Sequence, residues 1–219
     1  EATTGSAYEK VDDSDPTWGG APITFPRIQG ADVCGRIVAV GAGVNPARIG
    51  QRVITDGWLR DADEPLNMDK TGYFGSERDG GFAEYTTTPA ANALPIESPL
   101  SDAELATFSC SYSTAEGMLT RAGVTGADTV LVPGASGGVG GALVQLAKRR
   151  GARVIAMAAE AKHADVARLG ADRLLPRAPE DLRAALKDER ITVLADVVGG
   201  PQWPALIDIL TRGGRYTCS

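Results

Sequence analysis

The fold is decided by the stretch Val130-Leu131-Val132-Pro133-Gly134-Ala135-Ser136-Gly137-Gly138-Val139-Gly140, where a short apolar run leads into a glycine-rich turn and a predicted helix. Such a turn lets the backbone approach a pyrophosphate closely, and the free amides and positive dipole end of the following helix bind its charge. The pattern departs from GxGxxG because Ala135 stands at its first glycine. A turn that only packs helix on strand is the alternative, but four glycines in seven residues exceed that need. The sequence therefore predicts a dinucleotide site formed by Ser136, Gly137, Gly138, Val139 and Gly140.

Downstream of Gly126 the chain alternates regularly between apolar strand-like runs and helical segments. The expected strands are Thr129–Val132, Arg153–Met157, Arg173–Leu175, Ile191–Val197 and Arg215–Cys218. The expected helices are Val139–Arg150, Glu160–Leu169, Pro179–Asp188 and Gln202–Thr211. Apolar strands that alternate with helices indicate a parallel sheet covered on both faces. The predicted class is α/β, with a doubly wound Rossmann sheet in the second half.

The first half has a different character, because short apolar runs are separated there by Gly, Pro and Asp. Strands are expected at Arg36–Val40, Arg52–Thr55 and Gly81–Thr87, which predicts a mostly β domain. The polar segment Asp56–Asp79 is longer than the ~12 to 15 residues usual for a structureless loop, so it is either a functional lid or poorly ordered. Helices are expected at Ser101–Thr107, with capping-box spacing, and from Cys110 or Tyr112 to Ala122.

Composition excludes several classes of protein. The net charge is -6 and the basic residues are scattered, so no stripe exists to neutralise the phosphates of a nucleic acid. No apolar run approaches the ~20 residues that span a bilayer, and the acidic start does not resemble a signal peptide. The three cysteines, Cys34, Cys110 and Cys218, form no CxxC pair, which argues against a disulfide framework and a structural zinc site. We expect a cytoplasmic protein that acts on a small molecule.

The end of the second expected strand bears on the choice of cofactor. An NAD site normally has Asp or Glu there to accept hydrogen bonds from the ribose 2'-hydroxyl, whereas this strand ends Met157-Ala158-Ala159. Without an acid the 2'-phosphate of NADP(H) is tolerated beside Ala158, and Lys162 and Arg177 are cations that could pair with it. Glu160 is the counter-evidence, because it could hold the ribose hydroxyls instead. NADP(H) is favoured over NAD(H).

Several further motifs occur in an order that is typical of one family. They are Pro26 to Gly35 (PRIQGADVCG), Val38-Ala39-Val40-Gly41, Gly50-Gln51-Arg52-Val53, Gly80-Gly81-Phe82-Ala83-Glu84-Tyr85 and the GASGGVG turn. With these motifs the chain resembles the medium-chain dehydrogenase/reductase superfamily, and within it the zinc-independent quinone oxidoreductase-like branch. The resemblance implies a GroES-like domain over residues 1–111, incomplete at its N-terminal end, and a Rossmann domain over residues 112–219, incomplete at its C-terminal end. It also implies an internal fragment of an enzyme that forms a homodimer or homotetramer.

The resemblance places the zinc ligands of the family's alcohol dehydrogenases at positions that do not suit zinc here. The family's GHE motif corresponds to Gly30-Ala31-Asp32, and alanine cannot bind a metal. A later zinc cysteine of the family corresponds to Cys110, but one thiolate, even helped by Asp32, is short of the three protein ligands that a catalytic zinc needs. The cysteines of the family's structural zinc lobe are absent from Asp56–Asp79. We expect no zinc, and a packing role for Cys110.

The implied reaction is hydride transfer between NADPH and a quinone, an enone or another activated carbonyl-type small molecule. Local candidates for the proton donor are Tyr112, Ser113 and Thr114, and in the family the threonine that matches Thr114 lies near the nicotinamide. We assign catalytic roles to Tyr112 and Thr114, and Val198 and Gly199 join the predicted cofactor site. His163 is expected to be a solvated helix residue. A zinc alcohol dehydrogenase and a cofactor-binding protein without turnover are the alternatives.

Overall fold

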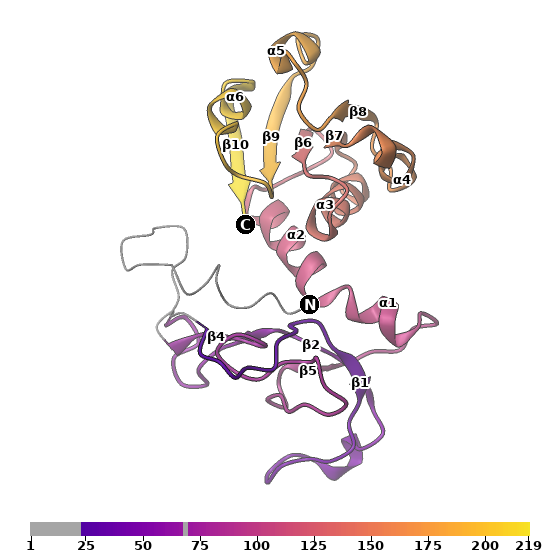
Figure 1. Ribbon diagram of the computed structural model, residues 1–219, viewed down its shortest axis with the longest axis vertical. Coiled ribbons are helices and arrows are strands. Elements are labelled where there is room, and N and C mark those ends of the chain that lie inside the picture. The colour runs from indigo at the N-terminus through magenta and orange to yellow at the C-terminus, as the bar shows by residue number, and fades with distance from the viewer. Residues whose placement is uncertain (1–22, 68–69) are drawn as a thin grey trace. The chain divides into compact units, whose positions relative to one another are not determined.

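The computed structural model describes residues 23–67 and 70–219. The chain divides between Ser109 and Cys110 into two compact units, which we call unit 1 and unit 2 (Figure 1). The domain boundary expected after residue 111 stays a prediction for the whole protein. Within the described residues no helix combines the length and the apolar character needed to cross a membrane.

Unit 2 is built on one parallel sheet. Its strands are β6 (Thr129–Pro133), β7 (Arg153–Ala158), β8 (Arg173–Pro176), β9 (Ile191–Asp196) and β10 (Leu210–Cys218). They lie in the order β10-β9-β6-β7-β8, and every pairing is parallel (Figure 1). The chain therefore starts in the middle of the sheet, moves to one edge and returns to build the other half. This is the doubly wound order, and it confirms the predicted Rossmann sheet.

Helices cover both faces of this sheet because successive side chains of a strand point to opposite faces. Val130 and Val132 pack into one apolar cluster and Leu131 into the other. The first cluster includes side chains of α2 (Ser109–Arg121), α3 (Gly138–Arg149) and α4 (His163–Arg168). The second includes Leu186, directly after α5 (Leu182–Ala185), and Leu206 of α6 (Trp203–Ile207). The continuous apolar character of the strands follows from this double burial.

The last helix and strand differ from the sequence prediction. The helix expected over Gln202–Thr211 ends at Ile207, and β10 begins at Leu210 rather than Arg215. The register of β10 on β9 shifts between Leu210 and Arg215, so the pairing is irregular there. The helix expected over Pro179–Asp188 is also shorter, because Asp181 caps it and it spans only Leu182–Ala185.

Unit 1 contains two small antiparallel sheets. The first pairs β1 (Cys34–Arg36), β2 (Arg52–Thr55) and β5 (Ala93–Pro95), and the second is the hairpin of β3 (Trp58–Leu59) and β4 (Gly72–Tyr73). A 3-10 turn, η1 (Pro46–Arg48), and the short helix α1 (Asp102–Ala106) complete the elements of this unit. The predicted strand Arg52–Thr55 is confirmed, and the one predicted at Arg36–Val40 lies at Cys34–Arg36 instead.

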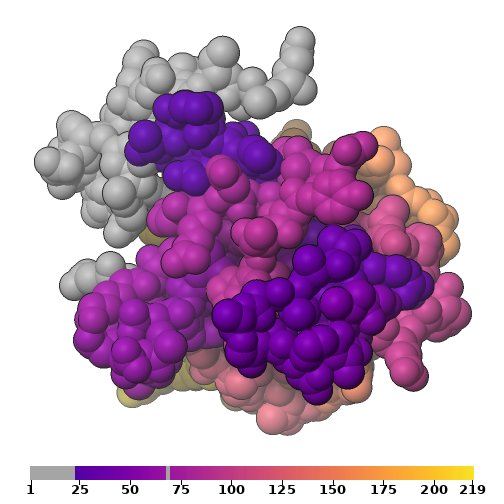
Figure 2. Space-filling view, turned by 90° about the horizontal axis from the view of Figure 1, so that it is seen from below, coloured from indigo at the N-terminus to yellow at the C-terminus, as the bar shows by residue number. Residues whose placement is uncertain are grey.

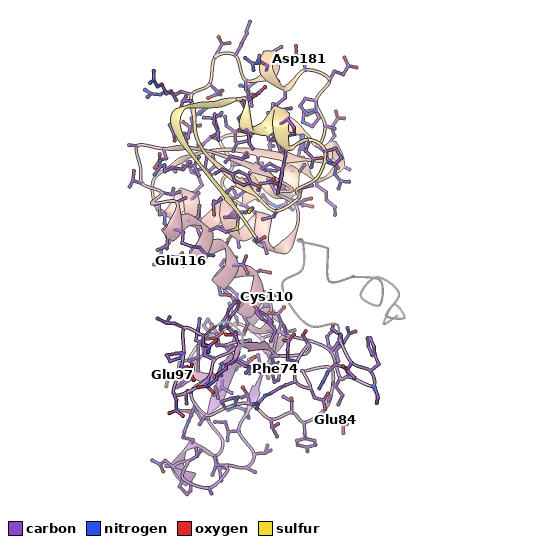
Figure 3. The ribbon with its side chains drawn as sticks, turned by 90° about the vertical axis from the view of Figure 1, so that its left-hand side faces the viewer. Phe74, Glu84, Glu97, Cys110, Glu116 and Asp181 are labelled. Carbon is purple, nitrogen blue, oxygen red and sulfur yellow. The ribbon has the colours of Figure 1, made fainter. Side chains whose placement is uncertain are left out.

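The segment expected to be a lid or poorly ordered contains the β3–β4 hairpin. The rings of Trp58 and Tyr73 meet edge to face with centroids 5.4 Å apart. Phe74, labelled in Figure 3, is 2% exposed and belongs to the core of unit 1. In Figure 2 the purple atoms of this region form a knob on the surface. The described part of the segment is therefore folded, and the Trp58–Tyr73 contact and the buried Phe74 stabilise it.

The strand predicted at Gly81–Thr87 is absent, and close backbone contacts explain why. The amides of Gly81 and Phe82 donate to the carbonyls of Gly30 (2.8 Å) and Gln29 (2.9 Å). A Cβ on Gly81 would lie 2.2 Å from Cγ2 of Val33. Gly81 therefore allows this segment to pack closely against residues 29–33, and the segment does not form a regular strand. The capping box of Ser101 and Glu104 at the start of α1 is confirmed.

Candidate cofactor site

The predicted dinucleotide turn connects β6 to α3 in unit 2. Gly134 adopts φ 69°, a left-handed conformation that favours glycine. The amide of Gly137 donates to the carbonyl of Gly134 at 3.0 Å, and the amide of Ala135 donates to the carbonyl of Met157 in β7, also at 3.0 Å. The turn is thus closed on itself and tied to the neighbouring strand.

Two glycines of the turn differ in how closely their surroundings approach them. A Cβ on Gly140 would lie 2.2 Å from the carbonyl oxygen of Gly134 and 2.8 Å from Cα of Ala135, so a side chain there collides with backbone. A Cβ on Gly137 would meet only the same carbonyl oxygen, at an ordinary contact distance of 3.5 Å. Packing alone explains Gly140. It does not explain Gly137, where the protein itself leaves room for a side chain.

The start of α3 is open to an anion. Gly137 is the N-cap residue and provides no side-chain cap. The first amides of a helix have no acceptor within the helix, and they carry the positive end of its dipole. Ser136, Gly137 and Gly138 are exposed, whereas Val139 is half-buried and Gly140 is buried. The exposed part of the predicted set therefore lies at a helix N-terminus, which is the kind of position where a pyrophosphate can bind, and its role stays a prediction.

The first turn of α2 lies against this site, and sequence reasoning missed the residue that makes the contact. A Cβ on Gly138 would lie 2.7 Å from Oγ of Ser111, so the serine hydroxyl sits at the start of α3. One indication of this residue was present in the sequence, because Ser111 directly precedes the candidate residues Tyr112 to Thr114. Ser111 is half-buried, so it can support the turn.

The proposed proton donors on α2 have the following places. The hydroxyl of Tyr112 accepts a hydrogen bond from Nε2 of Gln145 at 2.8 Å, about two helical turns along α3 from the glycine turn. Thr114 is half-buried, and Oγ of Ser113 donates to the carbonyl of Cys110 at 3.2 Å. The catalytic roles of Tyr112 and Thr114 stay predictions, and the observed contact of Tyr112 joins α2 to α3.

The loop after β9 meets the glycine turn. A Cβ on Gly134 would lie 2.8 Å from Cγ2 of Val198 and 3.2 Å from Cγ2 of Val197. The side chain of Val198 is 56% exposed, and Gly199 adopts φ 63°. In a doubly wound sheet the ligand crevice lies where the chain reverses direction, which here is between β6 and β9. The structure thus brings predicted residues of two separate strands together at that crevice.

The far end of the site lies at β7 and β8. Ala158 is 2% exposed and ends β7, and the following residues form a 3-10 turn, η3 (Glu160–Lys162). Arg177 follows the last residue of β8 and is exposed, as are Glu160 and Lys162. Within residues 23–67 and 70–219, neither Lys162 nor Arg177 belongs to an ion pair. No carboxylate of the described residues neutralises either cation, so both can attract an anionic ligand.

The prediction for His163 was wrong, because its side chain is half-buried rather than solvated. Its Nε2 lies 3.1 Å from the carbonyl of Ala158 and 3.2 Å from the carbonyl of Leu175. Both partners are acceptors, so Nε2 must carry the proton. The imidazole therefore joins the carboxyl ends of β7 and β8. Sequence reasoning missed it because the pattern placed His163 on an exposed helix.

Among the described residues, the positions that correspond to the family's zinc ligands do not supply a set that fits a zinc ion. Ala31 offers no ligand, Asp32 lines a cavity within unit 1, and Cys110 is half-buried in unit 2. No group of three His, Cys, Asp or Glu side chains with metal-binding geometry occurs in the part of the chain that the structure describes. His163, the one histidine of the sequence, already donates its Nε2 proton to carbonyls.

Both halves of the chain match known families. Residues 6–98 match the family described as Alcohol dehydrogenase GroES-like domain, and residues 138–219 match the one described as Zinc-binding dehydrogenase. The chain belongs to the medium-chain dehydrogenase/reductase superfamily. As a medium-chain dehydrogenase/reductase it has the GroES-like domain and the Rossmann domain that the motifs predicted.

Similar proteins of this superfamily include reductases and dehydrogenases. An acryloyl-coenzyme A reductase from Metallosphaera sedula is 33% identical over 88% of this chain and 60% of its own length. A Sinorhizobium meliloti 1021 protein assigned as an alcohol dehydrogenase has a TM-score of 0.83 and 48% identity, over 90% of this chain and 55% of its own. The quinone oxidoreductase from Coxiella burnetii has a TM-score of 0.68 and 28% identity, over 87% of this chain and 55% of its own. This chain thus spans little more than half the length of these proteins.

Proposed function

We propose that the protein is an NADPH-dependent oxidoreductase that transfers hydride, without a metal, to a quinone, an enone or another activated carbonyl-type small molecule. The observation that carries the proposal is the glycine turn between β6 and α3. Gly137 leaves space that the protein does not need for its own packing, and the helix behind it starts without a side-chain cap. Both features suit the close approach of a pyrophosphate.

The cofactor supplies the hydride chemistry when it is bound. Each half of the crevice is proposed to hold one half of the cofactor. The turn amides hold the pyrophosphate, and the half that contains β7 and β8 holds the adenosine. The half that contains β9 and β10 holds the nicotinamide nucleotide, with Val198 and Gly199 beside the glycine turn. Thr114 of α2 is assigned to the nicotinamide end on the family resemblance.

The preference for NADPH rests on charge at the end of β7. Ala158 places no carboxylate against a 2'-phosphate, and the unpaired cations Lys162 and Arg177 attract one. Glu160 is the residue through which NADH would be preferred instead, because its carboxylate could accept hydrogen bonds from the ribose hydroxyls.

The enone class of substrate is supported by the acryloyl-coenzyme A reductase, whose name describes a double bond conjugated to a carbonyl. Hydride addition to such a bond, or to a quinone, creates an oxyanion or enolate that a hydroxyl or water must protonate. The hydroxyls of Tyr112 and Thr114 are the proposed donors. The part of the chain that the structure describes contains no group of three metal-binding side chains, and Ala31 stands where the family's alcohol dehydrogenases have a metal-binding imidazole. Both observations favour a route without a metal.

Turnover and metal content test this function together. NADPH oxidation is followed with a panel of quinones, enones and enoyl thioesters, before and after dialysis against a chelator. We expect turnover that survives dialysis and no stoichiometric metal in elemental analysis. About one zinc per chain, with activity lost on chelation and restored by zinc, would support the alternative, a zinc alcohol dehydrogenase, which the names of the matched family and relatives favour. Cofactor binding without turnover on any substrate would support a non-catalytic binding protein.

Cofactor choice is tested by calorimetry with NADPH and NADH. A charge-assisted hydrogen bond to the 2'-phosphate is worth ~1.5 to 3 kcal/mol, so NADPH should bind about ten- to a hundredfold tighter. Lys162→Ala and Arg177→Ala should remove most of this preference, and added salt should weaken it in the wild type. Lys187→Ala, an exposed cation between α5 and β9, is the matched control. Equal binding of both cofactors, with NADH weakened selectively by Glu160→Gln, would overturn the charge argument.

The assembly and the location of the protein stay predictions from its sequence. A homodimer or homotetramer of the whole protein is measurable by light scattering coupled to gel filtration. A cytoplasmic location is measurable by cell fractionation.

A further inference from the structure

A buried carboxylate stands at the start of the loop that follows β9. Asp196, the last residue of β9, is 1% exposed. Its Oδ1 accepts hydrogen bonds from the amides of Val198 at 2.9 Å and Gly199 at 3.3 Å. Gly199 and Gly200 adopt φ 63° and 93°, so the loop turns sharply around the carboxylate. One oxygen of Asp196 therefore fixes the backbone of the two residues assigned to the cofactor site.

The second oxygen of Asp196 is held by α6. Nε1 of Trp203 donates to Oδ2 at 2.8 Å, and the indole ring meets the ring of Tyr216 edge to face, with centroids 5.9 Å apart. No cation pairs with Asp196 among the described residues. A buried carboxylate without a counter-ion is expensive unless its lone pairs are satisfied, so the three N–H donors are what allow it to stay there.

The fixed loop in turn supports the glycine turn. A side chain at Gly134 would be crowded, because a Cβ there would lie 2.8 Å from Cγ2 of Val198 and 3.2 Å from Cγ2 of Val197. A shift of the loop would either open a gap beneath Gly134 or press on the turn that binds the pyrophosphate. The chain of contacts runs from Trp203 through Asp196 and Val198 to Gly134.

We propose that Asp196 and Trp203 are positioning residues for the cofactor. They hold Val198 and Gly199 in place beside the glycine turn, where the nicotinamide half of the dinucleotide would bind. This inference rests on the proposed nicotinamide cofactor and extends it to two residues that do not themselves touch it. Trp203 lies in α6 and supports from a helix a loop that contains two consecutive glycines, Gly199 and Gly200.

The variant Trp203→Phe tests the contact with the least disturbance. It keeps an aromatic ring against Tyr216 and removes the N–H donor. Amide hydrogen exchange of the peptide that covers residues 197–203 should become faster without cofactor, and NADPH should bind about tenfold more weakly. KM for NADPH should rise by a similar factor while kcat changes little. Asp196→Asn should act in the same direction and more strongly, because an amide group cannot accept all three bonds.

Ile207→Val is the matched control, because this residue lies on the same helix α6 as Trp203, is 47% exposed and has no polar group that could bind Asp196. It should leave exchange and affinity unchanged. Unaltered exchange in Trp203→Phe overturns the inference, and so does faster exchange with unaltered NADPH affinity. A wild-type protein that binds neither NADPH nor NADH removes the proposed function and the inference with it, whereas equal affinity in wild type and Trp203→Phe removes the inference alone.

Discussion

The two edges of the parallel sheet in unit 2 treat charge in opposite ways. At the amino edge, Glu189 bridges Arg153 at the start of β7 (2.8 Å) and Arg173 at the start of β8 (3.0 Å). Asp128, directly before β6, pairs with Arg215 and accepts a hydrogen bond from Oγ1 of Thr192 at 2.8 Å. The two largely buried carboxylates of this edge are therefore neutralised by arginines whose side chains are partly exposed.

The carboxyl edge lacks such neutralisation among the described residues. Its one buried carboxylate, Asp196, is held by uncharged N–H groups, and the cations Lys162 and Arg177 have no ion-pair partner. The uncapped start of α3 adds a partial positive charge. The ion pairs of the amino edge contribute stability, whereas the carboxyl edge has hydrogen-bond donors and charges that lack such partners among the described residues and that the proposed function assigns to a ligand. Perturbing matched residues at the two edges separates these roles.

The largest effect is expected at Gly140 of the glycine turn. Gly140→Ala forces a Cβ into the backbone of Gly134, and such overpacking costs up to ~3 kcal/mol of unfolding free energy. Gly137→Ala meets no close atom and should change stability by less than ~0.5 kcal/mol. It should instead weaken NADPH binding at least about tenfold. Denaturant unfolding and calorimetry on both variants measure the two effects, and equal losses of stability would remove the distinction between the two glycines.

A smaller loss of stability is expected from the ion pair of the amino edge. Asp128→Ala leaves Arg215 without its carboxylate and Thr192 without its acceptor. Breaking a fully buried pair costs ~3 to 5 kcal/mol, and because the Arg215 side chain is 39% exposed we expect about 2 kcal/mol. NADPH affinity should stay within about twofold of the wild type. A large loss of affinity without loss of stability would show that the amino edge also serves binding.

Acid should weaken the amino edge first. The hydrogen bond from Arg153 and the charge of Arg173 hold the pKa of Glu189 below its ordinary value. Burial alone would raise the pKa of Asp128, but hydrogen bonds from Thr125 and Thr192 and the charge of Arg215 hold it below its ordinary value. A lowered carboxyl pKa gives stability that is present above the unfolded pKa of ~4 and is lost as pH falls through the folded value.

The variant Glu189→Gln should therefore unfold more easily at neutral pH and should lose less stability than the wild type as pH falls below ~4. Glu160→Gln, on the exposed η3 turn, is the control and should leave the acid profile unchanged. Thermal unfolding as a function of pH measures both. Parallel profiles for wild type and Glu189→Gln would contradict the assigned role of this carboxylate.

The smallest effect is expected at an exposed pair that belongs to neither edge. Asp165 and Arg168 of α4 form an i,i+3 pair whose side chains are 55% and 72% exposed. Such pairs contribute ~0.5 kcal/mol or less. Asp165→Asn should change the unfolding midpoint only slightly and leave NADPH binding intact. A loss comparable with that of Asp128→Ala would mean that ion pairing does not distinguish the amino edge.

The Rossmann half was readable in the sequence because its signals are local and agree with one another. Buried parallel strands have continuous apolar runs, and the glycine turn stands between a strand and a helix as the fingerprint requires. The error at β10 has a physical reason, because Leu210 pairs with Ile191 and Oγ1 of Thr211 donates to the carbonyl of Ile191 at 3.0 Å. This pairing places Leu210 and Thr211 in a strand, whereas the helical pattern of the sequence extended the helix through both residues.

Unit 1 was less predictable because its contacts join residues that are distant in the sequence. Trp58 pairs with Tyr73 across the hairpin, and no local pattern announces that register. In the site, the glycine turn and the neutral end of β7 followed from sequence. The contact of Ser111 and the hydrogen bonds of His163 and Asp196 could not be predicted from the sequence. Each depends on which backbone or side-chain group the fold brings close to it.

The bonds of His163 have a practical consequence. The sequence contains one histidine, and its Nε2 proton is shared between the carbonyl ends of β7 and β8. A proton NMR spectrum would therefore contain a single set of imidazole resonances from the natural sequence, and their chemical shifts would respond to any ligand that moves these two strand ends. The carboxyl ends of β7 and β8 thus have an intrinsic spectroscopic reporter that needs no label and no engineered residue.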